Sequence, residues 1–308
     1  MIFNSLDKIE NTPYQERLEL LGDKKKKPFL QKNFRSNMML NPLRLKHLNA
    51  IDNLEADMIT LNLEDAIAPS RKREALYNIA LFLSHLEESN SFIIVRTNPL
   101  EEGGEEEITF LNDFRFDAVR VAKVKSVDEI LKIDRLLNRE KEIHISLETK
   151  EAFSNLASFG TIERFTTANL GILDLLTSLG LPQSLVQRDN PTIGYILSKF
   201  LVDAKIAGVN PISFMFQDYN NVEEFRAWCK FEQKMGFTTK ACMGPKQVTI
   251  ANEIFGVESK EIRRANIIKD AFETSSAKGE NGFMHKEFGF IDEPIYRDAL
   301  LTLNFSQS

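Results

Sequence analysis

The 308-residue sequence predicts an α/β fold, a (β/α)8 TIM barrel with an N-terminal extension and a C-terminal helical segment. From residue 35 onward, short apolar, β-branched segments alternate with longer segments of helical period, which is typical of βα units and a parallel sheet. Eight strand candidates occur, and a length of roughly 250 residues fits one such barrel better than two doubly wound halves. No linker rich in proline, serine or glycine divides residues 35–255, so we expect one barrel domain.

The candidate strands share a short apolar core flanked by polar residues. They are Asn37–Leu40, Met58–Glu64, Phe92–Thr97, Ala118–Val124, Ile143–Glu148, Phe165–Leu170, Ile212–Phe216 and Thr239–Met243. Between most of them lie segments whose apolar residues recur every three to four positions, as expected for helices that cover a sheet. These are Pro42–Leu54, Ser70–Leu86, Val127–Leu137, Lys150–Ala157, Pro191–Ala207 and Val222–Met235.

The N-terminal extension, residues 1–34, is expected to pack on the barrel. Leu18, Leu20 and Leu21 suggest a short helix, and the run Lys24–Lys27 follows it. We interpret this run as a solvated turn, since a bare cationic run is usually exposed; a phosphate or nucleotide rim is the alternative.

We assign residues 35–256 to the barrel and residues 257–308 to the C-terminal segment. That segment is expected to contain a helix over Lys260–Thr274, a glycine-containing loop over Ser275–Gly282, and a second helix over Pro294–Leu303. We expect it to contact a neighbouring subunit.

The composition excludes several classes of protein. Lys and Arg number 39 against 45 Asp and Glu, a net charge of −6, whereas a nucleic-acid-binding protein usually carries a clustered basic face. The two cysteines, Cys229 and Cys242, form neither a disulfide framework nor a metal-binding spacing. No apolar run reaches the ~18 residues of a membrane span, and the first residues do not resemble a secretion signal. We therefore expect a cytoplasmic protein that binds neither nucleic acid nor membrane.

Charged residues follow several of the predicted strands. Strand two ends in Glu64 and Asp65, strand three in Arg96 and Asn98, strand four in Lys123 and strand five in Glu148, and the loop expected after strand six holds Asp174. Because a TIM barrel carries its active site at the carboxyl ends of its strands, these side chains are expected to meet in one site.

Two of these carboxylates suit a divalent cation. Mg²⁺ favours one or two carboxylates and keeps its other positions for waters and substrate oxygens, so Glu148 and Asp174 are candidate ligands. Such a metal polarises a carbonyl or holds an enolate, and the planar guanidinium of Arg96 complements a carboxylate or enolate oxygen. The alternative is that Glu148 caps the following helix and Arg96 pairs with a structural acid. The complete set favours a site.

Other motifs of catalysis are missing from the sequence. There is no Gly-x-Ser-x-Gly, P-loop or Gly-x-Gly-x-x-Gly motif, and the four histidines are scattered. His144, inside a predicted strand, is expected to be a packed or surface residue. The Gly103–Gly104 pair followed by Glu105–Glu107 is expected to form a mobile acidic loop.

The residues of the predicted site lie in segments that resemble a known family. The segments are Leu63-Glu64-Asp65-Ala66-Ile67, Val95-Arg96-Thr97-Asn98-Pro99, Leu147-Glu148-Thr149, Gly171-Ile172-Leu173-Asp174-Leu175, Pro245-Lys246-Gln247-Val248 and Phe290-Ile291-Asp292-Glu293-Pro294. Taken in order, they resemble the CitE-like branch of the HpcH/HpaI aldolase family over residues 35–298. That branch includes the citrate lyase β subunit, malyl-CoA and citramalyl-CoA lyases, and related thioesterases.

The resemblance implies a Mg²⁺-dependent enzyme, a homo-oligomer (trimer or hexamer), that makes or breaks a carbon–carbon bond through a metal-stabilised enolate. It implies that Glu148 and Asp174 hold the metal and that Arg96 acts in catalysis and binds the substrate's carbonyl or carboxylate.

The resemblance also implies roles for four further residues. Asp292 enters the site from a neighbouring subunit and serves acid–base chemistry. Glu64 and Asp65 lie at the edge of the site and support Arg96 or the metal's waters. Lys123 is expected to contact the substrate.

Three functions remain open at this point, because the sequence departs from the family pattern around the site, for example at Asn62, Lys125 and Leu173. The first is a carbon–carbon lyase acting on a 3-hydroxyacyl-CoA thioester of malyl, citramalyl or citryl type. The second is an aldolase acting on a free 2-oxo acid. The third is a catalytically degenerate barrel that serves as a binding subunit.

Overall fold

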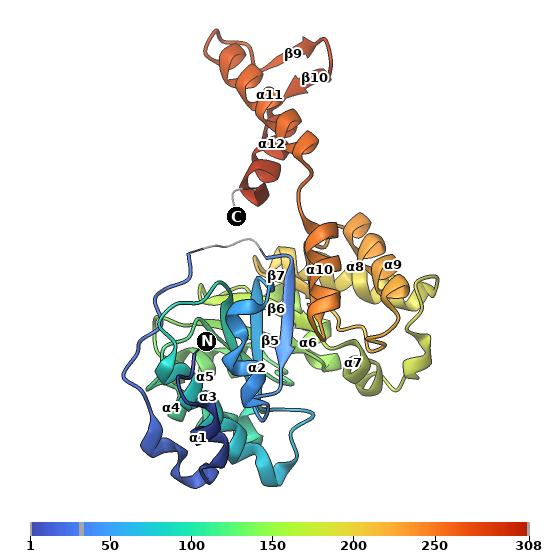
Figure 1. The fold of residues 1–308 in the computed structure, drawn as a ribbon. Coiled ribbons are helices and arrows are strands. Elements are labelled where there is room, and N and C mark those ends of the chain that lie inside the picture. The colour runs from blue at the N-terminus through green and yellow to red at the C-terminus, as the bar shows by residue number, and fades with distance from the viewer. Residues whose placement is uncertain (1, 31–33, 307–308) are drawn as a thin grey trace. The chain divides into compact units, whose positions relative to one another are not determined.

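A computed structural model describes residues 2–30 and 34–306 (Figure 1). The chain forms two compact units. Of the described residues, the first unit contains those up to Phe29 together with Arg35–Ile254, and the second contains Phe255–Ser306 together with Leu30 and Phe34. Each unit is described by itself below. No helix within the described residues has the length and apolar character needed to cross a membrane.

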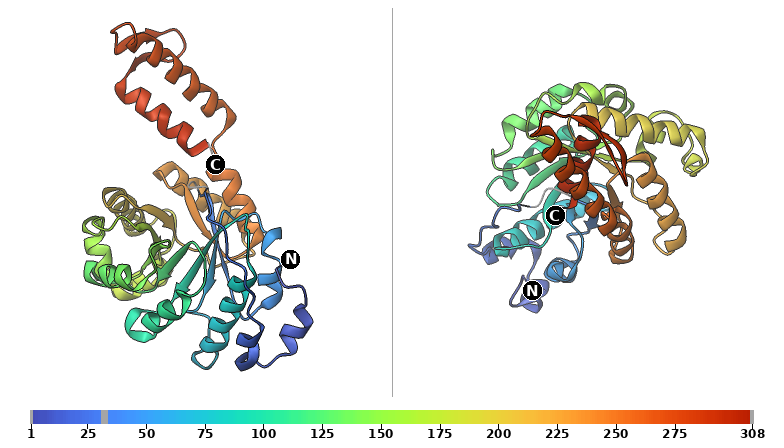
Figure 2. Two further views of the ribbon diagram at one scale, coloured as in Figure 1. Left: turned by 90° about the vertical axis from the view of Figure 1, so that its left-hand side faces the viewer. Right: turned by 90° about the horizontal axis from the view of Figure 1, so that it is seen from above.

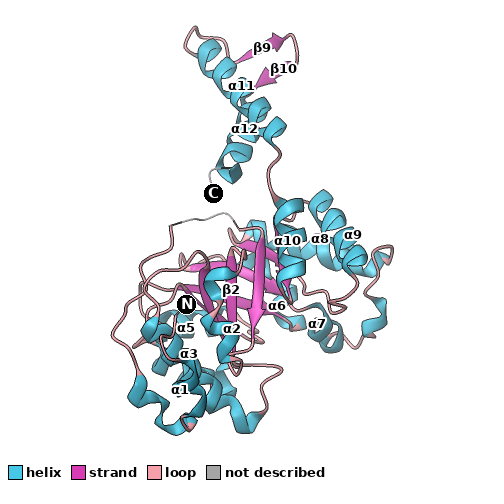
Figure 3. Cartoon of the chain, in the orientation of Figure 1, coloured by secondary structure: helices cyan, strands magenta, loops and turns pink. Residues whose placement is uncertain are grey.

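The first unit is a closed barrel of eight parallel strands that follow one another in chain order, with β8 pairing to β1. The strands are β1 (Ser36–Leu40), β2 (Met58–Asn62), β3 (Phe92–Thr97), β4 (Ala118–Val121), β5 (Glu142–Leu147), β6 (Phe165–Leu170), β7 (Asn210–Ser213) and β8 (Thr239–Cys242). Helices surround the strands (Figure 3). The predicted (β/α)8 barrel is thereby confirmed.

Helices connect the strands and cover the outside of the barrel. The α-helices of this unit are α1 (Leu6–Asn11), α2 (Leu45–Asn49), α3 (Lys72–His85), α4 (Gly104–Leu111), α5 (Val127–Leu136), α6 (Lys150–Asn155), α7 (Ile172–Ser178), α8 (Pro191–Ile206), α9 (Val222–Met235) and α10 (Pro245–Phe255). The 3₁₀ helices are η1 (Tyr14–Leu20) and the three-residue η2 (Ile51–Asn53), η3 (Pro69–Arg71), η4 (Leu100–Glu102), η5 (Leu156–Ser158) and η6 (Gln183–Leu185).

Local capping determines several helix ends. Asn190 accepts the N–H of Thr192 (2.9 Å) ahead of Pro191, the first residue of α8, where proline needs no amide donor. Helix α9 ends at Gly236, whose φ of 106° is a conformation that glycine adopts without a steric penalty. The sequence analysis therefore predicted the bounds of α9 correctly, because both ends carry recognisable stop signals.

Two helices replace expected loops. The acidic segment after Gly103 is not a mobile loop: it is the first turn of α4, and Glu107 within it is buried and accepts the N–H of Asn98 (2.8 Å). Asp174 likewise lies in the first turn of α7 rather than in a loop. Acidic side chains in a first helical turn are favoured by the helix dipole, which explains both placements.

Polar side chains form a layer inside the barrel, one step below the carboxyl ends of the strands. Asn37 of β1 donates to Asn169 Oδ1 of β6 (3.2 Å), and Thr60 of β2 donates to Asn37 Oδ1 (2.8 Å); all three side chains are buried. TIM barrels more often fill this space with branched apolar residues. Because buried polar groups need their partners, the layer holds these three strands in one arrangement beneath the site.

The N-terminal segment is anchored along α3 and the amino ends of the strands. The backbone N–H of Lys24 donates to Ser84 O (2.9 Å) and that of Lys27 donates to Glu87 O (2.8 Å). Lys26 is buried and its Nζ lies 2.8 Å from Asp117, the residue before β4. The expectation of a solvated run therefore holds for Lys24, Lys25 and Lys27, which are exposed, but is wrong for Lys26, whose buried ion pair joins the segment to the barrel.

The second unit contains more than helices. Helices α11 (Ser259–Ser276) and α12 (Glu293–Ser306) lie side by side, and a two-stranded antiparallel hairpin, β9 (Gly282–His285) and β10 (Gly289–Asp292), connects them (Figure 2). Its own apolar core consists of Ala265, Ile268, Phe272, Ile291, Ala299 and Leu303. The expected helices and the expected loop after the first of them agree with α11, α12 and the turn at 277–281 to within a few residues, whereas the β9–β10 hairpin was not expected.

Replacing Lys26 by Met is expected to destabilise the first unit by about 3 kcal/mol, because it leaves the buried Asp117 carboxylate without its cation. The free energy of urea unfolding measures the effect. Lys25→Met is the matched control, since Lys25 belongs to the same run, is exposed, and makes no ion pair within the described residues. Equal free energies of unfolding for the two variants would contradict a stabilising role of the Lys26–Asp117 ion pair.

Candidate active site

The candidate site begins with the register of adjacent strands. Asn62 of β2 pairs with Arg96 of β3, and Arg96 pairs with Arg120 of β4, so the three residues stand at one level of the barrel. Alternate residues of a strand point to the same face, so Glu64 and Glu148 follow inward-facing positions of β2 and β5. All five side chains are buried.

Arg96 is the centre of the cluster. Its Nη2 lies 2.9 Å from Glu64 Oε2 and its Nη1 lies 3.7 Å from Glu148 Oε1, while Nε donates to Asn62 Oδ1 (2.7 Å). The three partners come from two other strands, and a guanidinium has the planar donors to serve all of them. The sequence analysis predicted that these charged residues meet, and the structure brings them together.

Glu64 is held as a carboxylate by several partners. Its Oε2 accepts the N–H of Asp65 (2.6 Å), and its Oε1 lies 3.0 Å from Lys123 Nζ. Burial alone would raise the pKa of Glu64, but Arg96, Asp65 N–H and Lys123 outweigh it and lower the pKa to about 2. Glu64 is therefore ionised over the whole physiological range.

Asp65 stands beside this pair at the exposed rim. Partial burial and the neighbouring Glu64 carboxylate raise its pKa to about 6, against a usual 3.8, although Arg96 and Lys123 oppose the rise. Two adjacent carboxylates with pKa values moved in opposite directions are typical of an acid–base site.

Glu148 differs from Glu64 in having few partners. Its Oε2 accepts the backbone N–H of Lys123 (3.2 Å), and its contact with Arg96 is long (3.7 Å). Burial raises its pKa, and Arg120 and Arg96 oppose that rise. The helix after Glu148 is capped by Thr149, whose Oγ1 accepts the N–H of Ala152 (3.2 Å), so the alternative role of Glu148 as a helix cap is wrong.

Gly171 lets the side chain of Glu148 lie against the start of α7, the helix that carries Asp174. A Cβ on Gly171 would stand 2.3 Å from Cγ of Glu148, so only glycine fits at this start of α7. Asp174 lies three residues later, is exposed, and its charge adds to the rise in the pKa of Glu148. The two carboxylates therefore act on each other, and a cation between them would relieve their repulsion.

The donor set fits Mg²⁺ better than a transition metal. Within residues 2–30 and 34–306, no group of three or more His, Cys, Asp or Glu side chains is arranged to hold a metal ion. Two carboxylates with open positions for water and substrate are what Mg²⁺ commonly accepts, whereas zinc sites use three or four nitrogen, sulfur or oxygen ligands.

Lys123 occupies a strained backbone position. Its φ is 52°, in the left-handed region that residues with a side chain rarely adopt. In this conformation its N–H donates to Glu148 Oε2 (3.2 Å) and its Nζ lies 3.0 Å from Glu64 Oε1. Such strain persists where surrounding contacts hold it, and it is often found at functional sites.

The sequence analysis missed Arg120. It lies in the middle of the apolar strand β4, it is 6% exposed, and its Nε donates to Ser146 Oγ (2.8 Å). Burial and the neighbouring Arg96 lower its pKa to about 9. The available signal was a charged residue between two valines on an inward-facing position, which only a functional or paired cation occupies at reasonable cost.

Asp292 lies in the second unit, at the end of β10. Its Oδ1 accepts the N–H of Ile295 (3.3 Å) in the first turn of α12, so it caps that helix. That Asp292 enters the active site of a neighbouring subunit stays a proposal.

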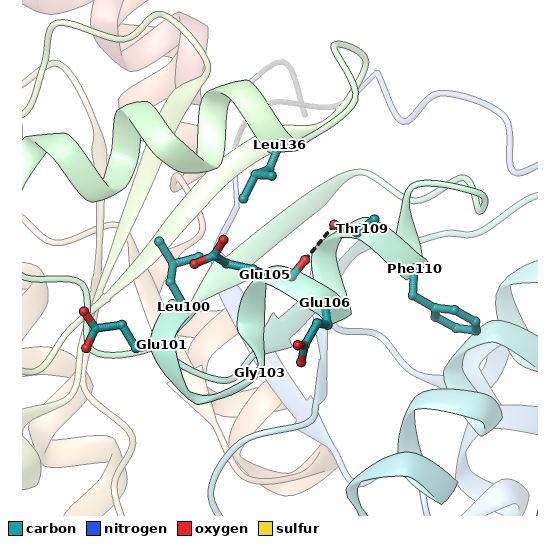
Figure 4. A pocket seen from close by; sticks show the side chains of 8 residues that line it. All are labelled: Leu100, Glu101, Gly103, Glu105, Glu106, Thr109, Phe110 and Leu136. Carbon is teal, nitrogen blue, oxygen red and sulfur yellow. Dashed lines mark hydrogen bonds between the residues drawn. The ribbon is translucent and has the colours of Figure 1, made fainter.

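A separate open cavity of about 610 Å³ lies along η4 and α4 (Figure 4). Its walls combine carboxylates with apolar side chains, namely Leu100, Glu101, Glu105, Glu106, Phe110 and Leu136. Glu105 is paired with Lys132 of α5. None of the seven predicted site residues is among the described residues that line it.

The raised pKa of Asp65 predicts a pH-dependent loss of stability. Between pH 4 and 6 the unfolded chain ionises this carboxyl while the folded protein still holds its proton, so the stability contribution of Asp65 falls as pH rises through this window. The free energy of unfolding of Asp65→Asn relative to the unsubstituted protein is therefore expected to rise from pH 4 to 6 and then stay level. Urea titrations of metal-free protein measure it, with exposed Asp113→Asn as control. A constant difference would contradict the assignment.

Comparisons with known proteins show which proteins the chain is similar to. A family model described as HpcH/HpaI aldolase/citrate lyase matches residues 36–245. A (3S)-malyl-CoA thioesterase of Cereibacter sphaeroides is 27% identical over 248 residues, which are 80% of this chain and 86% of the relative. An L-malyl-CoA/β-methylmalyl-CoA lyase of the same organism is 24% identical over 260 residues, 75% of this chain and 81% of the relative.

Solved structures share the fold. CitE of Mycobacterium tuberculosis, in complex with magnesium, acetoacetate and coenzyme A, has a TM-score of 0.72 at 17% identity and covers 91% of this chain and 100% of its own. A citrate lyase of Burkholderia xenovorans has a TM-score of 0.76 at 14% identity, covering 94% and 95%. The predicted resemblance and the predicted enzyme class, a carbon–carbon lyase, are confirmed. With a barrel of this type and a family model that matches more than half of its length, the chain belongs to the HpcH/HpaI aldolase/citrate lyase family.

Proposed function

We propose that the protein is a Mg²⁺-dependent lyase that cleaves or forms a 3-hydroxyacyl-CoA thioester of the malyl, citramalyl or citryl type. The observation that carries this proposal is the buried Arg96 between Glu64 and Glu148 at the mouth of the barrel, with Asp174 acting on Glu148. A purely structural barrel needs none of these charges, and burying them is costly.

The chemistry is a retro-aldol cleavage, also called retro-Claisen because a thioester enolate leaves. A base takes the proton of the substrate's 3-hydroxyl, the C–C bond breaks, and the products are a 2-oxo acid and the enolate of an acyl thioester, which is then protonated. Mg²⁺ held by Glu148 and Asp174 would supply Lewis-acid polarisation of the substrate's oxygens. The Arg96 guanidinium stands ready to donate hydrogen bonds to the developing oxyanion, and preorganised donors of this kind are commonly worth on the order of 10²–10³ in rate.

A second feature supports a thioester rather than a free 2-oxo acid. A cavity of about 380 Å³ lies between the loops after β1 and β2 and is lined by Asn41, Leu43, Arg44, Ala66, Ala68 and Arg71. It adjoins Asp65, the neighbour of Ala66. The exposed Arg44 guanidinium suits a phosphate of coenzyme A, whereas Arg71 in the same wall is already paired with Glu74 through Nε (2.8 Å) and Nη2 (2.9 Å).

Hydrolysis of the thioester is the second candidate, because a malyl-CoA thioesterase is among the relatives. Product analysis separates the two. A lyase releases a 2-oxo acid, detected as its phenylhydrazone, and leaves the thiol acylated; a thioesterase releases free coenzyme A, detected with a thiol reagent. Malyl-, citramalyl- and citryl-CoA are the substrates to assay, each with and without Mg²⁺. If neither product forms with any of them while the metal binds, a degenerate binding subunit becomes the better explanation.

Replacing Glu148 or Asp174 by Ala is expected to lower Mg²⁺-dependent turnover at least 10²-fold, since each removes a carboxylate from the cation site. Calorimetric titration with Mg²⁺ is expected to show weakened binding in both variants. Glu151→Ala, an exposed carboxylate in the first turn of α6, is the matched control and should leave both measurements unchanged. Normal turnover by either site variant would place the chemistry elsewhere.

We further propose a homotrimer or hexamer in which Asp292 serves acid–base chemistry in a neighbouring subunit. Arg96→Ala and Asp292→Ala proteins, each inactive, are then expected to regain partial activity when mixed under conditions of subunit exchange, because some sites receive both intact residues. Exchange is verified by native mass spectrometry with isotope-labelled subunits. Proven exchange with no recovered activity would refute the role in trans.

A further inference from the structure

Arg120 is a buried cation, and most of its hydrogen-bond donors have no acceptor within the described residues. Arg120 is 94% buried, given its 6% exposure, and its Nε donates to Ser146 Oγ at 2.8 Å. Within the described residues no other hydrogen bond or ion pair of Arg120 occurs, although a guanidinium carries five N–H donors. None of its nitrogens is among the described buried side-chain atoms that lack a partner, so the free donors keep a small accessible surface through which solvent or a ligand can accept from them.

The position of Arg120 directs its guanidinium toward the site. It is the register partner of Arg96 on the adjacent strand, and both point into the barrel. Ser146, which orients Arg120, stands two residues before Glu148 on β5, so the guanidinium is directed toward the carboxyl end of the barrel. The nearest opposite charges are Glu148 and Glu64, yet neither comes within ion-pair distance.

The neighbouring groups are already occupied. Glu64 is saturated by Arg96, Lys123 and the N–H of Asp65. Glu148 is the proposed partner of the metal. Two adjacent guanidinium groups repel each other, and a carboxylate that accepts from both removes this repulsion and supplies the missing hydrogen bonds.

We infer that Arg120, together with Arg96, forms a subsite for a second carboxylate on the small fragment of the substrate. This inference rests on the proposed function and selects among its three substrate types: the 2-oxo acid released by cleavage is a dicarboxylate, as in a citryl-type thioester. A glyoxylate or pyruvate fragment, which carries one carboxylate, would leave the Arg120 donors unpaired.

Pyruvate and oxaloacetate are the matched probes, because they differ by one carboxylate. Binding to the full-length protein is measured by calorimetry in the presence of Mg²⁺, with freshly prepared oxaloacetate. The unsubstituted protein is expected to bind oxaloacetate about 10- to 100-fold more tightly than pyruvate, the usual gain from a charge-assisted pair. Arg120→Met is expected to reduce this ratio to near one, and Arg120→Lys to an intermediate value.

Two further variants keep the test decisive. Ser146→Ala removes the hydrogen bond that orients the guanidinium and is expected to lower the oxaloacetate-to-pyruvate affinity ratio partially. This variant takes the place of Arg120→Met if Arg120→Met fails to fold. Arg139→Met, a loss of one cation on the exposed surface, should keep the full preference and controls for net charge.

The outcomes separate the two proposals. The subsite would be refuted if the unsubstituted protein bound pyruvate as tightly as oxaloacetate, or if Arg120→Met kept the full preference for oxaloacetate. Either result would leave the lyase proposal intact. No binding of either acid in the presence of Mg²⁺ would overturn both.

Discussion

The arrangement of the site depends on the burial of one guanidinium. Arg96 connects Asn62, Glu64 and Glu148, which belong to β2 and β5 and the turns that follow them. Taking an arginine out of water costs several kcal/mol unless its donors are met, and here Asn62 and Glu64 accept from Nε and Nη2, while Nη1 lies 3.7 Å from Glu148 and keeps donors for a substrate. Because these partners belong to β2 and β5 and the turns after them, Arg96 of β3 connects the ends of three strands and also supplies positive charge to the site. The hydrogen-bonded layer of Asn37, Thr60 and Asn169 beneath it provides a rigid floor.

The two buried carboxylates beside Arg96 have different tasks because they have different partners. Glu64 accepts from three groups, and its pKa falls to about 2. Glu148 accepts one backbone N–H and has only a long contact with Arg96, so burial prevails and its pKa rises. Glu64 is therefore a fixed anion that orients Arg96 and Lys123. Glu148 lacks the charge neutralisation that Glu64 has, which is the condition under which a carboxylate gains most from a bound cation.

Much of the fold was predictable from periodicity and stop signals. The bounds of β3 and β6 were predicted correctly, since polar or turn residues stand at both ends of these apolar segments. β2 and β4 were predicted two and three residues too long. In both cases the apolar pattern continues into a turn, where Glu64 and the left-handed Lys123 have already left the ladder. The β9–β10 hairpin was missed because its strands are short and half exposed, so they carry no apolar run.

The charged residues that were misread show what a single sequence lacks. Lys26 lies among three other lysines and looks solvated, yet it is buried, because Asp117 lies 91 residues away in the chain and only the barrel brings the two together. Arg120 carried a clearer signal, a cation between two valines, but its significance depends on which neighbours already have partners. Glu64 is satisfied and Arg120 is not, although both are buried charges on inward-facing positions. Sequence pattern identifies a buried charge; only the geometry tells whether the protein itself pairs it or leaves it to a ligand.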